Sequence, residues 1–199
     1  MNYINEIDHY NSEYDGINYK PVQILDRDDR FPFGELIIRQ TFEEDKNDIT
    51  QIYKKVVLLN SLYSTNIYAT FDVALKIFRI DNFSERVSHG DLSLVEEIRR
   101  NNISGKNKDF YSFSTKYCHH HNPSGFPIYD SFVEERLIYF LSEYECKVIK
   151  SKLKKYSYFK EMMDTLAEKW NLPHDYLYIK LDKYLWKKGK EEKDRKNGN

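Results

Sequence analysis

Apolar residues recur at intervals of three and four positions along most of the chain, which is the pattern of helices with one buried face. Residues 48–61 show it first, with Ile49, Ile52, Val56 and Leu59 on one side. The same spacing returns in the segments 71–78, 82–89, 94–101, 110–121, 131–144, 158–170 and 174–188. We therefore predict an all-α fold, mainly helical, with at most a short strand pair.

The two ends of the chain lack this periodicity. Residues 1–35 are rich in Asn, Asp and Tyr, and we predict an irregular acidic arm with a short strand at Val22–Leu25. A short extended piece is expected at Leu36–Arg39. Residues 189–199 are polar and mostly charged, which predicts a disordered tail. The helical domain then spans residues 36–188.

Aromatic and reactive side chains are concentrated in residues 111–133, which read YSFSTKYCHHHNPSGFPIYDSFV. Two prolines and a glycine predict a loop between two helices, the second of which begins at Asp130 or Ser131. A polar turn, residues 101–109, leads into this stretch. Lys116 stands in the first of the two helices, so the stretch holds one lysine and one aspartate on neighbouring elements.

Composition narrows the class of protein. With 40% hydrophobic and 32% charged residues among 199, the chain suits a folded domain with a sizeable core. Two cysteines cannot build a disulfide framework or a four-thiolate iron–sulfur cluster. The apolar runs are too short to span a membrane, and the N-terminus lacks a signal-peptide pattern. We expect a cytoplasmic protein with no membrane partner.

Charge is divided unevenly along the chain. Residues 1–50 carry 5 basic and 12 acidic side chains, whereas the remaining residues carry 26 basic and 20 acidic ones. An acidic N-terminal segment followed by a basic remainder is compatible with a nucleic-acid partner, although the formal net charge of the chain is only −1.

Lys116 and Asp130 are the candidate reactive pair. Tyr111, Phe113 and Tyr117 lie close to Lys116 in the sequence, and desolvation by such neighbours lowers the pKa of an amine. A neutral amine can attack an electrophilic carbon and form a Schiff base. A carboxylate at a helix start is kept ionised there and can stabilise a cationic transition state. The plainer alternatives are a solvated lysine and a helix-capping aspartate.

Three short sequences carry a resemblance to a known family. STKYC, then a loop and PIYDSFV, with LDKYLW near the end, resemble the core of the helix-hairpin-helix DNA glycosylase superfamily, in particular its 8-oxoguanine-glycosylase-like branch. Thr115–Lys116 match the family's threonine and nucleophilic lysine, and Asp130 matches the aspartate that assists bond cleavage. The resemblance implies a DNA glycosylase, with or without cleavage of the abasic strand, that acts on a flipped nucleotide. It implies neither a metal nor a cofactor.

Further residues are candidates for contact with DNA. The segment after residue 59 is rich in amides and hydroxyls, with a capped turn as the alternative interpretation. Consecutive helical residues point about 100° apart, so the Cys-His-His-His run does not predict a metal site. The candidate contacts are Asn60, Tyr63, Asn66, Lys106, Lys108, Ser114, Thr115, His119, His120 and Tyr129.

Two other classes of function remain open. The chain can be a helical nucleic-acid-binding or interaction module on a glycosylase-like scaffold, without the chemistry. Binding that persists in Lys116→Ala, with no base release, indicates that class. The chain can also be a regulatory helical protein with no nucleic-acid partner, which a lack of salt-dependent DNA affinity would indicate.

Overall fold

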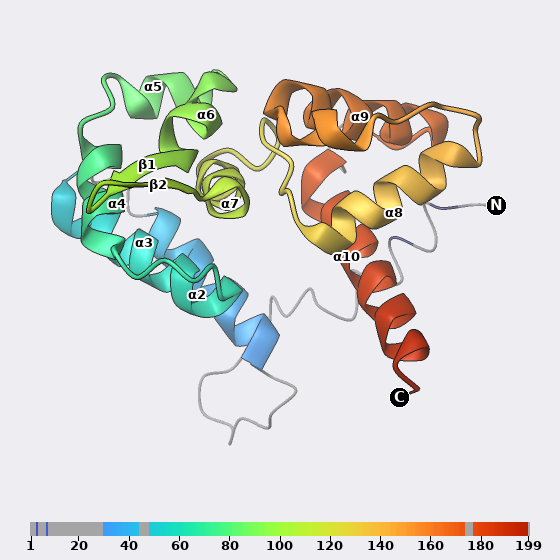
Figure 1. Ribbon diagram of the computed structural model, residues 1–199, viewed down its shortest axis with the longest axis horizontal. Helices are drawn as coiled ribbons and strands as arrows, with labels where there is room; N and C mark the ends of the chain where they lie inside the picture. Colours follow the sequence, from blue (N-terminus) through green and yellow to red (C-terminus); the bar gives the residue numbers. More distant parts are fainter. Residues whose placement is uncertain (1–2, 4–6, 8–29, 44–47, 174–176, 199) are drawn as a thin grey trace.

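The helices form two lobes that meet along helix α7 and the loop that follows it (Figure 1). This computed structural model describes residues 3, 7, 30–43, 48–173 and 177–198. The first lobe holds α2 (Arg30–Glu43), α3 (Ile49–Tyr63), α4 (Thr70–Phe78), α5 (Phe83–Ser88), α6 (Ser93–Arg99), β1 (Arg100–Ile103), β2 (Lys106–Asp109) and α7 (Tyr111–His121). The second holds α8 (Ser131–Ser142), the short 3-10 helix η2 (Lys150–Lys154), α9 (Tyr156–Lys169) and α10 (Leu177–Lys196).

The prediction of a mainly helical fold is confirmed. From α3 to α9, each predicted helix has a counterpart whose ends lie within three residues of the predicted ones. A helix-hairpin-helix glycosylase arrangement of these elements stays a proposal.

The segment Leu36–Arg39, which was predicted to be extended, lies inside helix α2. Pro32 is the third residue of this helix, where the missing N–H has no intrahelical acceptor to lose. Ile38 and Phe42 are four positions apart and buried, so the helix is held by packing. Residues 30–35, which were predicted to belong to the irregular arm, are therefore helical. The strand predicted at Val22–Leu25 lies outside the described residues.

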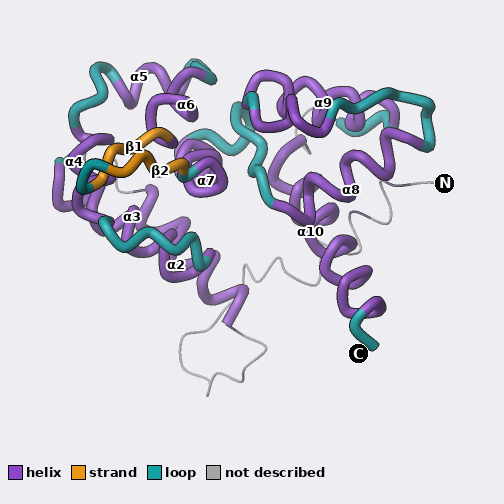
Figure 2. Tube along the Cα trace, in the orientation of Figure 1, coloured by secondary structure: helices purple, strands orange, loops and turns teal. Residues whose placement is uncertain are grey.

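Residues 101–109 form most of an antiparallel hairpin rather than an open polar turn. Strands β1 and β2 pair from Arg100 opposite Asp109 to Ile103 opposite Lys106, and Figure 2 colours them orange. Ser104 and Gly105 connect the strands with φ of 52° and 76°. Two left-handed residues are what a two-residue hairpin turn requires, and Gly105 adopts that conformation without steric cost.

The tail that was predicted to be disordered continues helix α10 as far as Lys196. Glu192 bridges Arg136 of α8 at 3.3 Å and Lys196 at 3.4 Å, so the charged residues form ion pairs across and along helices. Gly189 lies against α8, where an added Cβ would meet the Cβ of Phe132 at 2.6 Å. Close helix packing and charge pairing thus replace the apolar stripe that the tail lacks.

Helix α7 lies at the centre of the molecule. Eight of its residues are buried, including the polar side chains of Ser114, Thr115, Lys116 and His119. It packs against α2, α3 and α6, and the loop after it crosses to the second lobe (Figure 1). Near the N-terminus Tyr3 stacks on Trp170 with ring centroids 4.1 Å apart. None of the helices in the described residues is long and apolar enough to cross a bilayer.

Candidate functional site

Lys116 lies in the second turn of α7 with only 4% of its surface exposed. Its Nζ donates a hydrogen bond to the Ser112 hydroxyl at 2.5 Å, one turn earlier. Burial lowers the pKa of Lys116, while the carboxylates of Asp130 and Asp182 act in the opposite direction. The amine is therefore easier to deprotonate than an ordinary lysine.

Asp130 is the N-cap of α8. One carboxylate oxygen accepts a hydrogen bond from the Phe132 backbone N–H at 2.9 Å, and the other lies 3.9 Å from Lys116 Nζ. Its side chain is 26% exposed, whereas that of Lys116 is 5% exposed. The structure thus brings the two predicted residues together, with the carboxylate on the more accessible side.

The residues that precede this pair also contact each other. Thr115 Oγ1 accepts a hydrogen bond from the Tyr129 backbone N–H at 3.0 Å and donates to the Ser112 carbonyl at 2.9 Å. The neighbouring hydroxyl of Ser114 donates to the Tyr111 carbonyl at 2.8 Å. Ser114 and Thr115 have no exposed surface, so in this structure they are not positioned to bind a DNA phosphate.

Tyr63, at the end of α3, forms an aromatic wall beside the amine. Its ring centre lies 5.2 Å from Lys116 Nζ, and its hydroxyl is 3.0 Å from His120 Nε2. Burial raises the pKa of Tyr63 and places the pKa of His120 well below its ordinary value. Both groups are therefore neutral at physiological pH, and the ring face attracts the ammonium form of Lys116.

Asp182 of α10 is a buried carboxyl that the sequence did not single out. It is 4% exposed, and its Oδ2 has no hydrogen-bond partner among the described residues. Burial raises the pKa of Asp182 to about 7. The charge of Lys183 and the backbone N–H groups of Lys183 and Ile128 act in the opposite direction and lower it. The motif LDKYLW contains Asp182, but only the packing of α10 against α8 reveals that it is buried near Lys116.

The histidine run of α7 does not converge on one point. His119 Nδ1 is 2.7 Å from the Phe126 carbonyl, whereas the ring of His121 packs against Phe42 and Phe83. Burial lowers the pKa of His119 to about 4 and that of His121 to about 3. These two histidines serve as neutral packing and hydrogen-bonding groups inside the first lobe.

The loop between α3 and α4 is braced by Asn60. Its side chain accepts from the Thr65 hydroxyl at 2.8 Å and the Ile67 N–H at 2.9 Å, and donates to the Ile67 carbonyl at 2.9 Å. Asn60 is therefore occupied inside the loop, while Asn66 is exposed. Tyr68, which the sequence did not single out, is 97% exposed.

Lys106 and Lys108 lie on strand β2, all of whose residues are exposed. A surface cavity of about 420 Å³ borders this hairpin and is lined by Lys108, Arg100 and three asparagines. A second, of about 530 Å³, lies beside α4 and α6. Neither of these two cavities is lined by Lys116 or Asp130.

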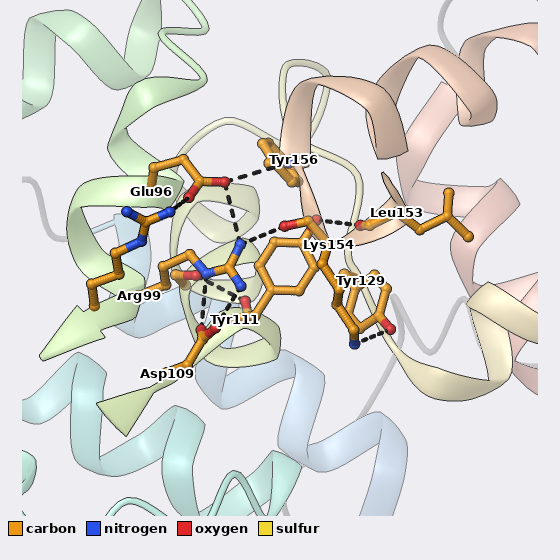
Figure 3. A network of polar contacts seen from close by, with 10 residues as sticks. Glu96, Arg99, Asp109, Tyr111, Tyr129, Leu153, Lys154 and Tyr156 are labelled. Carbon is orange, nitrogen blue, oxygen red and sulfur yellow. Dashed lines mark hydrogen bonds and ion pairs between the residues drawn. The ribbon is translucent and has the colours of Figure 1, made fainter. Parts of the chain in front are cut away.

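A polar network joins the lobes next to Asp130 (Figure 3). Arg99 binds Asp109 through Nε at 2.8 Å and Nη2 at 2.6 Å, and it donates to the Lys154 carbonyl at 2.6 Å. The Lys154 amine in turn donates to the hydroxyl of Tyr129, the residue before Asp130. The sequence did not indicate Arg99 as part of the site, because its partners come from β2 and η2.

Fold and site together define a two-lobed, mainly helical protein with a buried lysine and an aspartate paired between the lobes. The chain belongs to the HI_0787_N family, described as an N-terminal domain, which matches residues 6–125. It is also 41% identical over 167 residues to a protein of Haemophilus influenzae described as uncharacterized, covering 82% of this chain and 80% of that one. No solved structure gives a significant match. The family match includes Lys116 and ends before Asp130.

Proposed function

We propose that this protein is a cytoplasmic DNA glycosylase that removes a damaged or modified base through Lys116. One observation carries the proposal. The Lys116 amine is buried, with a lowered pKa, and lies 3.9 Å from a carboxylate that caps the next helix. A nucleophilic amine and a fixed negative charge are the two groups that displacement at a sugar C1′ needs.

The chemistry follows from these two groups. The free amine of Lys116 attacks C1′ of a flipped nucleotide, the N-glycosidic bond breaks, and the base leaves with a proton that the amine gives up. Asp130 stabilises the positive charge that develops on the sugar while the bond breaks. The sugar ring then opens as the C1′–O4′ bond breaks and the remaining N–H proton passes to O4′, which gives a Schiff base between Lys116 and C1′.

The surroundings of Lys116 support this role. Lys116 is only 4% exposed, so burial keeps most water from the amine, and the Tyr63 ring faces it at 5.2 Å. The loop that carries Asn66 and Tyr68 follows directly after Tyr63. Lys106 and Lys108 add exposed positive charge for the DNA backbone.

Burial of the lysine favours a second candidate function. With only 4% of Lys116 exposed, the structure has to rearrange around the amine before a nucleoside can reach it. A protein that never opens would be a non-catalytic nucleic-acid-binding or interaction module on the same scaffold.

Borohydride trapping tests the proposal. The protein is incubated with duplex DNA carrying an assortment of damaged and modified bases, and sodium borohydride reduces any Schiff base to a stable cross-link. We expect a cross-link with the parent and with Lys150→Gln, which removes a lysine whose side chain is 70% exposed, but none with Lys116→Gln. Equal trapping by Lys116→Gln would remove Lys116 from the reaction. DNA binding without base release, unchanged in Lys116→Ala, would identify the non-catalytic module.

A further inference from the structure

The hydroxyl of Thr115 connects two parts of the chain that carry the candidate reactive groups. It donates to the Ser112 carbonyl in its own helix at 2.9 Å and accepts from the Tyr129 N–H at 3.0 Å. Thr115 has no exposed surface, so water does not replace either bond. A buried N–H without an acceptor is strongly unfavourable, which makes the bond to Tyr129 a strict requirement of this packing.

The two residues joined by this bond are the sequence neighbours of Lys116 and Asp130. Thr115 immediately precedes Lys116, and Tyr129 immediately precedes Asp130. We infer that Thr115 is a positioning residue that fixes the register between α7 and the start of α8, and so holds the Asp130 carboxylate opposite the Lys116 amine. This inference rests on the proposed function and names a residue on which that function depends.

The rest of Tyr129 contacts both lobes, and its ring centroid lies 4.5 Å from that of Tyr111 in α7. Its ring packs against Phe159 with centroids 5.3 Å apart, and its hydroxyl is bound to Glu134 and to the Lys154 amine. Asp130 itself is tied to α8 through the Phe132 N–H. The segment before α8 is therefore anchored in the second lobe by side chains, and the Thr115 bond supplies a directional contact to the helix that carries Lys116 beside the Tyr111 ring contact.

The chain provides matched variants for a test. Thr115→Val keeps the shape of the side chain and removes the hydroxyl, whereas Thr115→Ser restores a hydroxyl. Ser114→Ala removes a hydroxyl that is equally buried but bonds only within α7, to the Tyr111 carbonyl. Thr115→Ala is a second hydroxyl deletion in case Thr115→Val does not fold.

Labelling of Lys116 by formaldehyde and cyanoborohydride tests the inference without DNA. The label adds to the free amine, so the midpoint of its pH dependence, followed by mass spectrometry, reports the pKa of Lys116. Because the Asp130 charge raises the pKa of Lys116, Asp130→Asn is expected to lower the midpoint. Thr115→Val is expected to lower the midpoint by at least about half of the shift seen in Asp130→Asn. Thr115→Ser and Ser114→Ala are expected to leave the midpoint unchanged. A midpoint that Thr115→Val leaves at the parent value, or that Asp130→Asn does not move, overturns the inference.

Single-turnover base release separates this inference from the proposed function. We expect Thr115→Val to slow release about tenfold with an unchanged Kd for DNA, because a small misplacement of a reacting group is costly. In an Asp130→Asn background the same substitution is expected to change the rate less than about twofold, since its target is gone. Equal slowing in both backgrounds would assign Thr115 a general structural role. A parent that releases no base would overturn the proposed function, while the labelling result still decides on Thr115.

Discussion

Asp182 shows how a single residue couples the site to pH. Burial raises its pKa from 3.8 to about 7, and the charged groups that face it are Lys183, Glu35 and Lys116. Because the pKa is higher in the folded state, the stability that this residue contributes is full below about pH 4 and is lost as the pH rises through about 7.

The stability of Asp182→Asn relative to the parent is therefore expected to increase as the pH rises. Between pH 5 and pH 8 the free energy of unfolding of the variant should improve relative to the parent by roughly 2–3 kcal/mol, measured by urea unfolding at both values. Asp72→Asn, which replaces an exposed carboxylate of α4, is the control measured at the same two pH values. A constant difference for Asp182→Asn would mean that its carboxyl titrates as an ordinary aspartate.

At the residue scale, the sequence predicted that Lys116 and Asp130 lie on neighbouring elements, but it did not predict which other side chains surround them. A helix followed by a proline-rich loop and a helix-capping aspartate places Lys116 and Asp130 on neighbouring elements. The contributions of Tyr63, Asp182 and Arg99 depend on helices that are distant in sequence, so local spacing does not reveal them. Their assembly requires the tertiary packing of both lobes.

Among the elements, α8 and α10 pack closely against each other in the second lobe. An added Cβ at Gly189 would lie 2.6 Å from the Phe132 Cβ and 3.1 Å from its backbone. Gly189→Ala is expected to lower the free energy of unfolding by about 1–3 kcal/mol, although alanine is the better helix former.

Denaturant unfolding measures this effect, with Asp194→Ala on the same helix as the control. Asp194 is exposed, so its replacement should change the stability by less than about 0.5 kcal/mol. A Gly189→Ala protein at least as stable as the parent would show that α10 does not lie this close to α8.

If the proposed function holds, the exposed lysines of the β1–β2 hairpin offer positive charge to a nucleic acid. Because Lys106 and Lys108 are exposed, replacing both with Gln is expected to weaken binding to any duplex and to reduce the slope of log K against log salt by about 2. Binding titrations at several salt concentrations check this. Replacing Lys147 and Lys152 of the second lobe is the matched control, and an equal change there would mean that only net charge matters.

Three elements differ from the sequence prediction, and each difference has a physical reason. In α2, Pro32 suggested a broken segment, yet it falls in the first turn, where a helix accepts it. Gly34 of the same helix lies against Leu62 of α3. In the hairpin, strands of four mostly polar residues carry no alternating pattern, so the segment was predicted only as a polar turn. The α10 tail depends on partners in α8 that local composition does not show.

For the whole molecule, the connection between the lobes determines whether Lys116 and Asp130, the candidate reactive pair, come together. Lys116 belongs to the first lobe and Asp130 to the second, and the loop of residues 122–130 joins them. Beside that loop, Arg99 is 6% exposed and binds both Asp109 and the Lys154 carbonyl. Its guanidinium also lies 4.1 Å from the centre of the Tyr111 ring. The polar network of Figure 3 is therefore a second connection between the lobes, in addition to the loop.

Arg99→Leu is expected to lower the free energy of unfolding by about 3 kcal/mol, because it leaves the Lys154 carbonyl and Asp109 without their partner. Arg99→Lys should recover only part of this, since an ammonium cannot reproduce the two parallel bonds to Asp109. Urea unfolding gives the stabilities, and hydrogen exchange at the Tyr129 amide shows whether the segment before Asp130 has loosened. Arg100→Leu, whose side chain is 78% exposed, should change stability by less than about 0.5 kcal/mol. If Arg99→Leu matched Arg100→Leu in stability and left Tyr129 protected, the lobes would be held by apolar packing and by the Thr115 bond instead.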